Sequence, residues 1–188
     1  MKIKFSLAVA IFSVLSLGSA SALADSISAE YRYGDIRDGD AVETNEYKVV
    51  YSAKVYEDVS AEFEASTKQA TDEGPTSSKF STRAVLALPE LFGVKSNVKA
   101  ELGSSLARND NYNFWGYSVD ASHSLYGPFS VNVGFRYRTE LNGGRDEYRY
   151  NGGVTYALDS GDSLAAQYYQ TRGPASVSYA GVVYTHKL

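Results

Sequence analysis

The sequence lacks several kinds of residue on which familiar protein classes depend. Its 188 residues include no cysteine, four prolines, two histidines and one tryptophan. The absence of cysteine excludes both a disulfide framework and a thiolate metal site. No apolar run beyond residue 24 approaches the length of a membrane helix, which excludes an α-helical membrane protein. A membrane β-barrel stays open despite the mean hydropathy of −0.28, because alternating strands average out on any hydropathy scale.

The first 24 residues have the features of a secretory signal peptide. A basic start with Lys2 and Lys4 precedes an apolar run over 5–17, and Ala22-Leu23-Ala24 is a small-residue cleavage site. We expect residues 1–24 to be removed and residues 25–188 to form one domain. Loss of the two leader lysines leaves 16 basic against 22 acidic residues, a net charge of −6. This acidic balance argues against a nucleic-acid partner.

Residues 129–158 show the pattern that the rest of the chain repeats. Apolar and polar side chains alternate strictly along 129–138 and again along 148–156, as in strands with one apolar and one polar face. Between them, Asn142-Gly143-Gly144-Arg145 is a hairpin signal, because glycine supplies the positive φ of a tight turn. A turn centred on the two glycines predicts that Tyr137 faces Tyr150 and that Arg138 faces Arg149.

The whole mature chain divides into ten such segments, with no helical pattern between them. We expect strands over 26–33, 46–55, 59–68, 79–88, 94–106, 112–125, 129–138, 148–158, 163–172 and 176–188. The side-chain alternation of 163–172 is ambiguous around Tyr168 and Tyr169. Connections alternate between longer, more polar segments and short turns, and an even strand number returns the chain to its starting side, as in outer-membrane barrels. The predicted fold is an all-β, transmembrane, antiparallel up-and-down β-barrel of about ten strands.

The placement of aromatic residues favours a membrane barrel over a soluble one. Tyrosines and Trp115 gather at one end of the predicted strands, Tyr56, Phe92, Tyr126 and Phe129 lie near the other, and Ala, Val and Leu dominate between them. Two aromatic girdles around an aliphatic band are typical of a sheet that crosses a bilayer. A soluble barrel of lipocalin type explains the alternation but not the girdles. We therefore expect the protein in the cell outer membrane, in contact with its lipid.

The polar faces predict a basic lumen. The pore-lining residues that we expect to bind solute are Arg32, Lys48, Arg83, Lys95, Lys99, Arg136, Arg138 and Arg149. Lys54 and Lys187 share this face, and the acids expected there are fewer: Glu30, Glu62, Glu64, Glu101 and Asp120. Two interpretations remain open, a basic pore or a plug of mutually satisfied Arg and Glu side chains. The excess of bases favours the pore, because a buried charge without a partner is costly.

Two stretches resemble the oligogalacturonate-specific porin family. Ser26-Ile27-Ser28-Ala29-Glu30-Tyr31-Arg32-Tyr33 is similar to the mature start of that family. Phe135-Arg136-Tyr137-Arg138-Thr139-Glu140, followed by the stretch from Glu147 to Tyr156, is similar to its arginine–tyrosine hairpin. The resemblance implies a narrow, monomeric outer-membrane channel, lined by arginines, that passes small anionic solutes such as acidic oligosaccharides. Members of the family have twelve strands, which makes twelve the alternative to the ten counted in this chain.

An enzyme is the weaker hypothesis. His123 and His186 both fall on the lipid-facing side near the short-turn ends of their strands, where amphipathic rings are common. Asp38 and Asp40 lie in a long acidic loop and are expected to be solvating charges. We expect no enzymatic activity, no cofactor and no metal. A non-conducting structural or adhesive barrel, with the loops as its working surface, remains the alternative to a channel.

Overall fold

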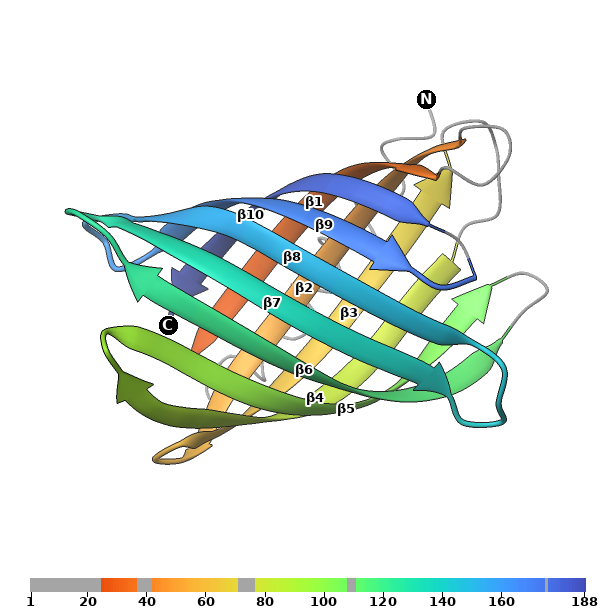
Figure 1. Cartoon of the computed structure of the whole chain (residues 1–188), viewed down its shortest axis with the longest axis horizontal. Helices are drawn as coiled ribbons and strands as arrows, with labels where there is room; N and C mark the ends of the chain where they lie inside the picture. The colour runs from red at the N-terminus through yellow and green to blue at the C-terminus, as the bar shows by residue number, and fades with distance from the viewer. Residues whose placement is uncertain (1–24, 37–41, 71–76, 108–110, 175) are drawn as a thin grey trace.

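The computed structural model describes residues 25–36, 42–70, 77–107, 111–174 and 176–188, and these form a barrel of ten strands. The strands are β1 (Ser26–Ile36), β2 (Val42–Tyr56), β3 (Val59–Ala70), β4 (Ser77–Leu91), β5 (Val94–Ala107), β6 (Tyr112–Ser124), β7 (Phe129–Glu140), β8 (Asp146–Ala157), β9 (Ser163–Arg172) and β10 (Val177–Lys187). Figure 1 shows them tilted and wrapped around a common axis. The predicted signal peptide and the acidic residues Asp38 and Asp40 lie outside the described residues.

Each strand pairs antiparallel with its neighbours in sequence, and β1 pairs with β10 to close the barrel. The closing register runs from Ser26 opposite Lys187 to Ile36 opposite Val177. This confirms the antiparallel up-and-down barrel and its ten strands, so the alternative of twelve strands is wrong for the described chain. No helix in the described residues is long and apolar enough to span a membrane.

Short turns connect the strands at one end of the barrel. Only Glu57-Asp58 separates β2 from β3, and only Phe92-Gly93 separates β4 from β5. Phe92 has φ 52° and Gly93 has φ 74°, which is the pair of positive values that a two-residue type I′ hairpin needs. Pro89 lies where the pairing of β4 with β5 shifts register between Leu88 and Leu91, a place that tolerates a residue without an N–H.

The distribution of side chains is the reverse of that in a soluble protein. Large apolar side chains are exposed on the outer face, as Val133 is at 60%. The lumen instead holds charged side chains, and Arg32 is only 1% exposed. Because a sheet in lipid must present apolar groups outward and can keep polar groups in its interior, this arrangement is that of a transmembrane barrel.

The β7–β8 hairpin differs from the predicted register. Its connection is Leu141–Arg145, so Tyr137 faces Tyr148, and Arg136 rather than Arg138 faces Arg149. The prediction of Arg138 opposite Arg149 is therefore wrong. The pairing slides by two residues, which preserves the face of every side chain, because side chains alternate with a period of two. The expectation that Arg136 and Arg138 point inward survives the change.

The ambiguous alternation of β9 is resolved by the fold. Tyr169 is buried on the lumen side, whereas Tyr168 is exposed on the outer face opposite Ala180 of β10. The rule of alternation cannot choose between two adjacent tyrosines, and the pairing with β8 and β10 decides it.

Candidate functional site

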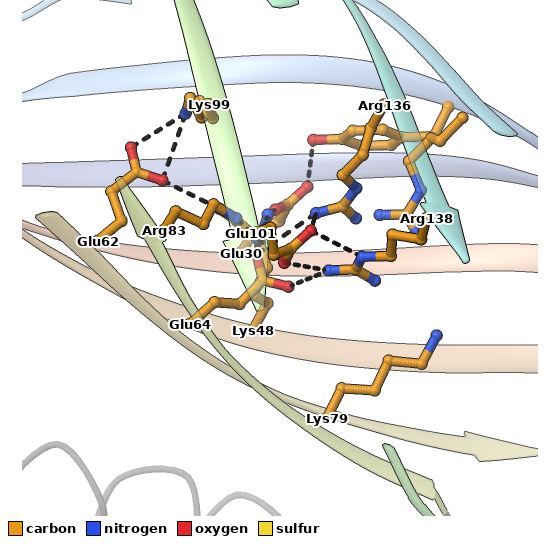
Figure 2. Close-up of polar contacts among 12 residues, drawn as sticks. Glu30, Lys48, Glu62, Glu64, Lys79, Arg83, Lys99, Glu101, Arg136 and Arg138 are labelled. Atoms are coloured by element: carbon orange, nitrogen blue, oxygen red, sulfur yellow. Dashed lines mark hydrogen bonds and ion pairs between the residues drawn. The ribbon is translucent and has the colours of Figure 1, made fainter. Parts of the chain in front are cut away.

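The lumen contains a layer of charged side chains contributed by eight of the ten strands. Figure 2 shows many of these side chains pointing toward one another from different walls of the barrel. The ion pairs join eight basic residues to seven acidic ones. The basic members are Arg32, Lys48, Lys79, Arg83, Lys99, Arg136, Arg138 and Arg149, and the acidic members are Glu30, Glu46, Glu62, Glu64, Glu101, Asp120 and Glu147. We call this set the charged layer.

On the side of β1 and β2, Arg32 is enclosed by carboxylates. Its Nε and Nη2 donate to Glu30 at 2.6 and 2.9 Å, and its Nη1 donates to Glu46 at 3.3 Å. Glu30 also contacts Lys48 and accepts a hydrogen bond from the Tyr169 hydroxyl. The guanidinium of Arg32 lies 4.0 Å from the centre of the Tyr169 ring, a cation–π distance. Every charge in this group is therefore satisfied by the barrel itself.

On the wall formed by β3, β4 and β5, Arg83 binds three glutamates. Its Nη1 donates to Glu62 at 3.0 Å, its Nε to Glu101 at 3.2 Å and its Nη2 to Glu64. The three acids lie on the strands that flank Arg83, because Glu62 and Glu101 are its direct cross-strand neighbours. Lys99 adds a further cation at 3.0 Å from Glu62.

Arg138 reaches from β7 across Gly116 of β6 to Glu101 on β5, the next strand but one, and further round the barrel to Glu64 on β3. Its Nε and Nη2 donate to Glu101 at 2.9 and 2.7 Å, and its Nη2 also donates to Glu64 at 3.4 Å. The stem of Arg138 passes over Gly116, where a Cβ would lie 3.0 Å from the Arg138 Cγ. Its guanidinium rests 4.6 Å from the centre of the Phe114 ring. We call this bridge, from Arg138 to Glu64 and Glu101, the strut.

Arg136 has no comparable partner. Its Nη1 lies 3.9 Å from Glu64 and 4.0 Å from Glu101, and its buried Nε has no hydrogen-bond acceptor among the described residues. Directly opposite, Arg149 donates from Nε to Thr171 at 3.2 Å and keeps its Nη2 at 3.6 Å from Glu147. Two guanidinium groups therefore face each other across the β7–β8 ladder, and neither has a carboxylate closer than 3.6 Å to balance its charge.

A cavity of about 140 Å³ opens beside these arginines. Its cationic lining consists of Arg32, Lys48, Arg83, Lys99, Arg136 and Arg149, and its other lining residues are Ser118, Asp120, Asn151 and Tyr169. Six basic side chains thus border one space together with a single carboxylate. The glutamates of the charged layer are not among the lining residues, so basic groups outnumber acidic ones on the cavity wall.

Seven of the eight pore-lining residues predicted from the sequence belong to the charged layer. Lys95 does not, because it is exposed at the short-turn end of β5. Lys54 and Lys187 are exposed at the ends of their strands in the same way. The lumen is also less basic than predicted, since Glu46 and Glu147 lie within it. Glu147 lies just outside the strand expected over 148–158, and the longer β8 carries it inward opposite Arg138.

Away from the charged layer, the lumen is lined by neutral hydrogen-bonding groups. The Gln167 Nε2 donates to the side-chain amide oxygen of Asn132 at 2.7 Å, and the Asn132 Nδ2 donates to the Thr155 hydroxyl at 3.1 Å. The amide oxygens of Gln167 and Asn97 are buried with no hydrogen-bond donor among the described residues. These acceptors are available to a hydroxylated solute or to water.

The two histidines have structural partners on the outer face. His123 bonds through Nδ1 to the Gly93 carbonyl oxygen at 3.0 Å and so fastens the Phe92-Gly93 turn. His186 lies 2.9 Å from Asp162, which also accepts a hydrogen bond from Tyr184 at 2.7 Å. The Tyr184 hydroxyl holds the pKa of Asp162 below its ordinary value. In the described residues, no group of three His, Cys, Asp or Glu side chains is placed to hold a metal ion.

Comparison with known proteins places the fold among outer-membrane barrels. The β domain of the Bordetella autotransporter BrkA matches with a TM-score of 0.55 at 10% identity, over 88% of this chain and 100% of that one. The KdgM porin in complex with disordered oligogalacturonate matches at 0.48 and 13% identity, over 84% and 98%. Neisserial surface protein A matches at 0.48 and 11% identity, over 87% and 96%. By sequence, the chain matches no protein family and no curated protein.

Taken together, the closed sheet, the apolar outer face and the buried charges define the class of protein. The chain is a transmembrane β-barrel with the fold of outer-membrane proteins.

Proposed function

We propose that the protein is an outer-membrane channel that passes small anionic solutes, acidic oligosaccharides among them, and that it has no enzymatic role. The leader at residues 1–24 would direct export, and the exposed apolar band would contact membrane lipid. Strands of 10 to 15 residues are long enough to cross a bilayer, for which about 9–11 tilted residues suffice.

The observation that carries this proposal is the cavity in the lumen, whose lining is mainly basic. Six basic side chains and one acidic side chain border it, and two of the bases, Arg136 and Arg149, have carboxylates only at 3.6 to 4.0 Å. Rings of Arg and Lys are the means by which anion pores select their ions. A guanidinium also matches the planar geometry of a carboxylate, which is the charged group of an acidic sugar. The neutral amides elsewhere in the lumen are suited to sugar hydroxyls.

A non-conducting structural barrel is the second candidate, and the strut favours it. Arg138 and Arg83 hold carboxylates from both sides, and the side chains of the charged layer fill the middle of the lumen. Small barrels are commonly filled by side chains in this way. The two functions differ in one measurable property, because only the channel conducts ions.

Current across a planar lipid bilayer in a salt gradient distinguishes the two. The unmodified protein should conduct, with a reversal potential that reports anion preference. The double substitution Arg136→Gln and Arg149→Gln should lower the anion-over-cation permeability ratio by about fivefold or more. A unit charge about 4 Å away contributes about 1 kcal/mol even at the dielectric constant of water, which corresponds to a factor of about five.

Arg172→Gln is the matched control, because Arg172 is exposed on the outer face at the end of β9 and the charge change is the same per residue. It should leave the reversal potential unchanged. Absence of current from the unmodified protein, in chloride and in sulfate alike, would reject the channel and favour the structural barrel. An unchanged permeability ratio in the double variant would reject the cavity as the selective element.

A further inference from the structure

One pair of carboxylates in the lumen is shared by two arginines that lie two residues apart on β7. Glu64 and Glu101 are held by Arg138 at 2.7 to 3.4 Å. Arg136 reaches the same two carboxylates only at 3.9 and 4.0 Å. Arg136 lines the cavity, whereas Arg138 does not. The strut and the cavity are therefore adjacent, but Arg138 forms the strut and Arg136 lines the cavity.

The cavity side of this row is suited to a single oxyanion. Arg136 and Arg149 are directly opposed, so their Cβ atoms are about 4.5–5.5 Å apart and both guanidinium groups border one space. The cavity of about 140 Å³ is about ten times the space that one water molecule requires. A carboxylate, sulfate or phosphate group would receive hydrogen bonds from both forks and would relieve the repulsion between them.

An anion at this position would also compete for Arg138. Glu64 and Glu101 do not depend on Arg138 alone, because Arg83 donates to both. If Arg138 turned toward an anion held by Arg136 and Arg149, the glutamates would keep Arg83 and no buried charge would lose all its partners. The exchange therefore breaks the hydrogen bonds of Arg138 to Glu64 and Glu101. It does not leave an isolated buried ion, which would carry a large cost.

We propose that an oxyanion bound between Arg136 and Arg149 opens the lumen by replacing Glu64 and Glu101 as the partner of Arg138. The inference rests on the proposed channel function and adds its regulation. In the resting barrel the strut joins β7 to the wall of β3 and β5. In the anion-bound barrel Arg138 no longer contacts Glu64 and Glu101, and the arginines of β7 and β8 line an open path. The expected ligand is a carboxylate, sulfate or phosphate group. Each of these has paired oxygens that match the two N–H groups of a guanidinium fork, whereas chloride does not.

Single-channel recording tests the proposal with sulfate as the probe. Chloride is replaced stepwise by sulfate at constant ionic strength, and the fraction of time spent open is measured. In the unmodified protein this fraction should rise with sulfate and saturate as a single-site curve. Arg136→Gln should abolish the rise. Glu101→Gln, which removes the main acceptor of the strut, should give a high open fraction in chloride alone and no further rise with sulfate.

Glu140→Gln is the control, because it makes the same substitution at the end of β7, where the carboxylate lies 3.8 Å from Arg145 and outside the charged layer. It should keep the sulfate response of the unmodified protein. Folding of each variant is checked by its heat-dependent mobility on a denaturing gel, and Glu64→Gln replaces Glu101→Gln if the latter does not fold. Thermal unfolding gives a second readout, in which sulfate should raise the midpoint of the unmodified protein but not of Arg136→Gln.

The outcomes separate this inference from the channel itself. An anion-selective current that ignores sulfate, with the same open fraction in Glu101→Gln, would overturn the inference and leave the channel in place. Sulfate that stabilises the fold without changing the open fraction would overturn the coupling between site and strut. No current in any anion would reject the channel and the inference together.

Discussion

The environment of each side chain in this barrel depends on the face of the sheet on which it lies. Val133 is exposed to the outside, and the adjacent Asn132 is bonded inside the lumen to Thr155 and Gln167. Their backbone positions differ by one residue, yet the solvent of one is lipid and that of the other is the polar interior. Substitutions at such neighbours should therefore have different energetic consequences although the sequence change is the same.

We expect Val133→Arg to destabilise the barrel by about 2–4 kcal/mol, because a charged side chain near the midplane of the lipid face carries that cost. Asn132→Arg should cost much less, since the lumen already accommodates arginines. The measurement is the free energy of unfolding in lipid vesicles, by denaturant titration. Equal costs at the two positions would show that the outer face is not in contact with lipid.

At the scale of the element, the β7–β8 hairpin illustrates how register decides the role of a residue. Arg136 and Arg138 are chemically identical and point to the same face. The observed register places Arg136 against Arg149 and Arg138 against Glu147. One arginine is therefore in a repulsive pair, and the other is the centre of a buried ion network.

The same substitution at these two positions should have opposite effects on stability. Arg136→Gln removes a directly opposed like charge and should be neutral or stabilising by up to about 1 kcal/mol. Arg138→Gln removes the hydrogen bonds of Arg138 to Glu101 and Glu64, which Arg83 still holds, and should cost about 1.5–3 kcal/mol. Unfolding free energies of both variants, measured side by side, report the register. The reverse order would support the pairing of Arg138 with Arg149 that the turn sequence predicted.

At the scale of the whole molecule, the ten strands give the barrel two unlike ends. Two-residue turns at Glu57-Asp58 and Phe92-Gly93 join strands at one end, which also holds the five-residue Leu158–Asp162 connection. The other end, which holds Leu141–Arg145, has no two-residue turn between the described strands. In outer-membrane barrels the short turns face the periplasm and the longer loops face the outside. Asn142 should therefore be extracellular, and Ser160, in the β8–β9 turn, should be periplasmic.

Labelling of intact cells tests this orientation. A cysteine at Asn142 should react with a membrane-impermeant maleimide, and a cysteine at Ser160 should react only after the cells are opened. The chain has no cysteine of its own, so each variant carries a single reactive thiol. Reaction at Ser160 in intact cells, without reaction at Asn142, would reverse the orientation.

The fold could be predicted from the sequence because its signal is local. A period of two separates lipid-facing from lumen-facing residues within each strand, and the alternation of turns and loops fixes an up-and-down topology. The same signal identified seven of the eight basic residues of the charged layer and missed Lys79. It failed where the pattern is short-range and ambiguous, as at Tyr168 and Tyr169, and at strand ends, where Glu46 and Glu147 were not recognised as inward residues.

The sequence by itself determined that this chain makes ten amphipathic strands with an apolar and a charged face, because those properties depend on neighbours along the chain. Only the tertiary structure decided which charges compensate one another. Glu64 and Arg138 are 74 residues apart, and closure of the barrel sets them 3.4 Å from each other. Closure also leaves the buried Nε of Arg136 without an acceptor among the described residues, because the register of β7 on β8 and the shared carboxylates of β3 and β5 depend on contacts that no stretch of sequence contains.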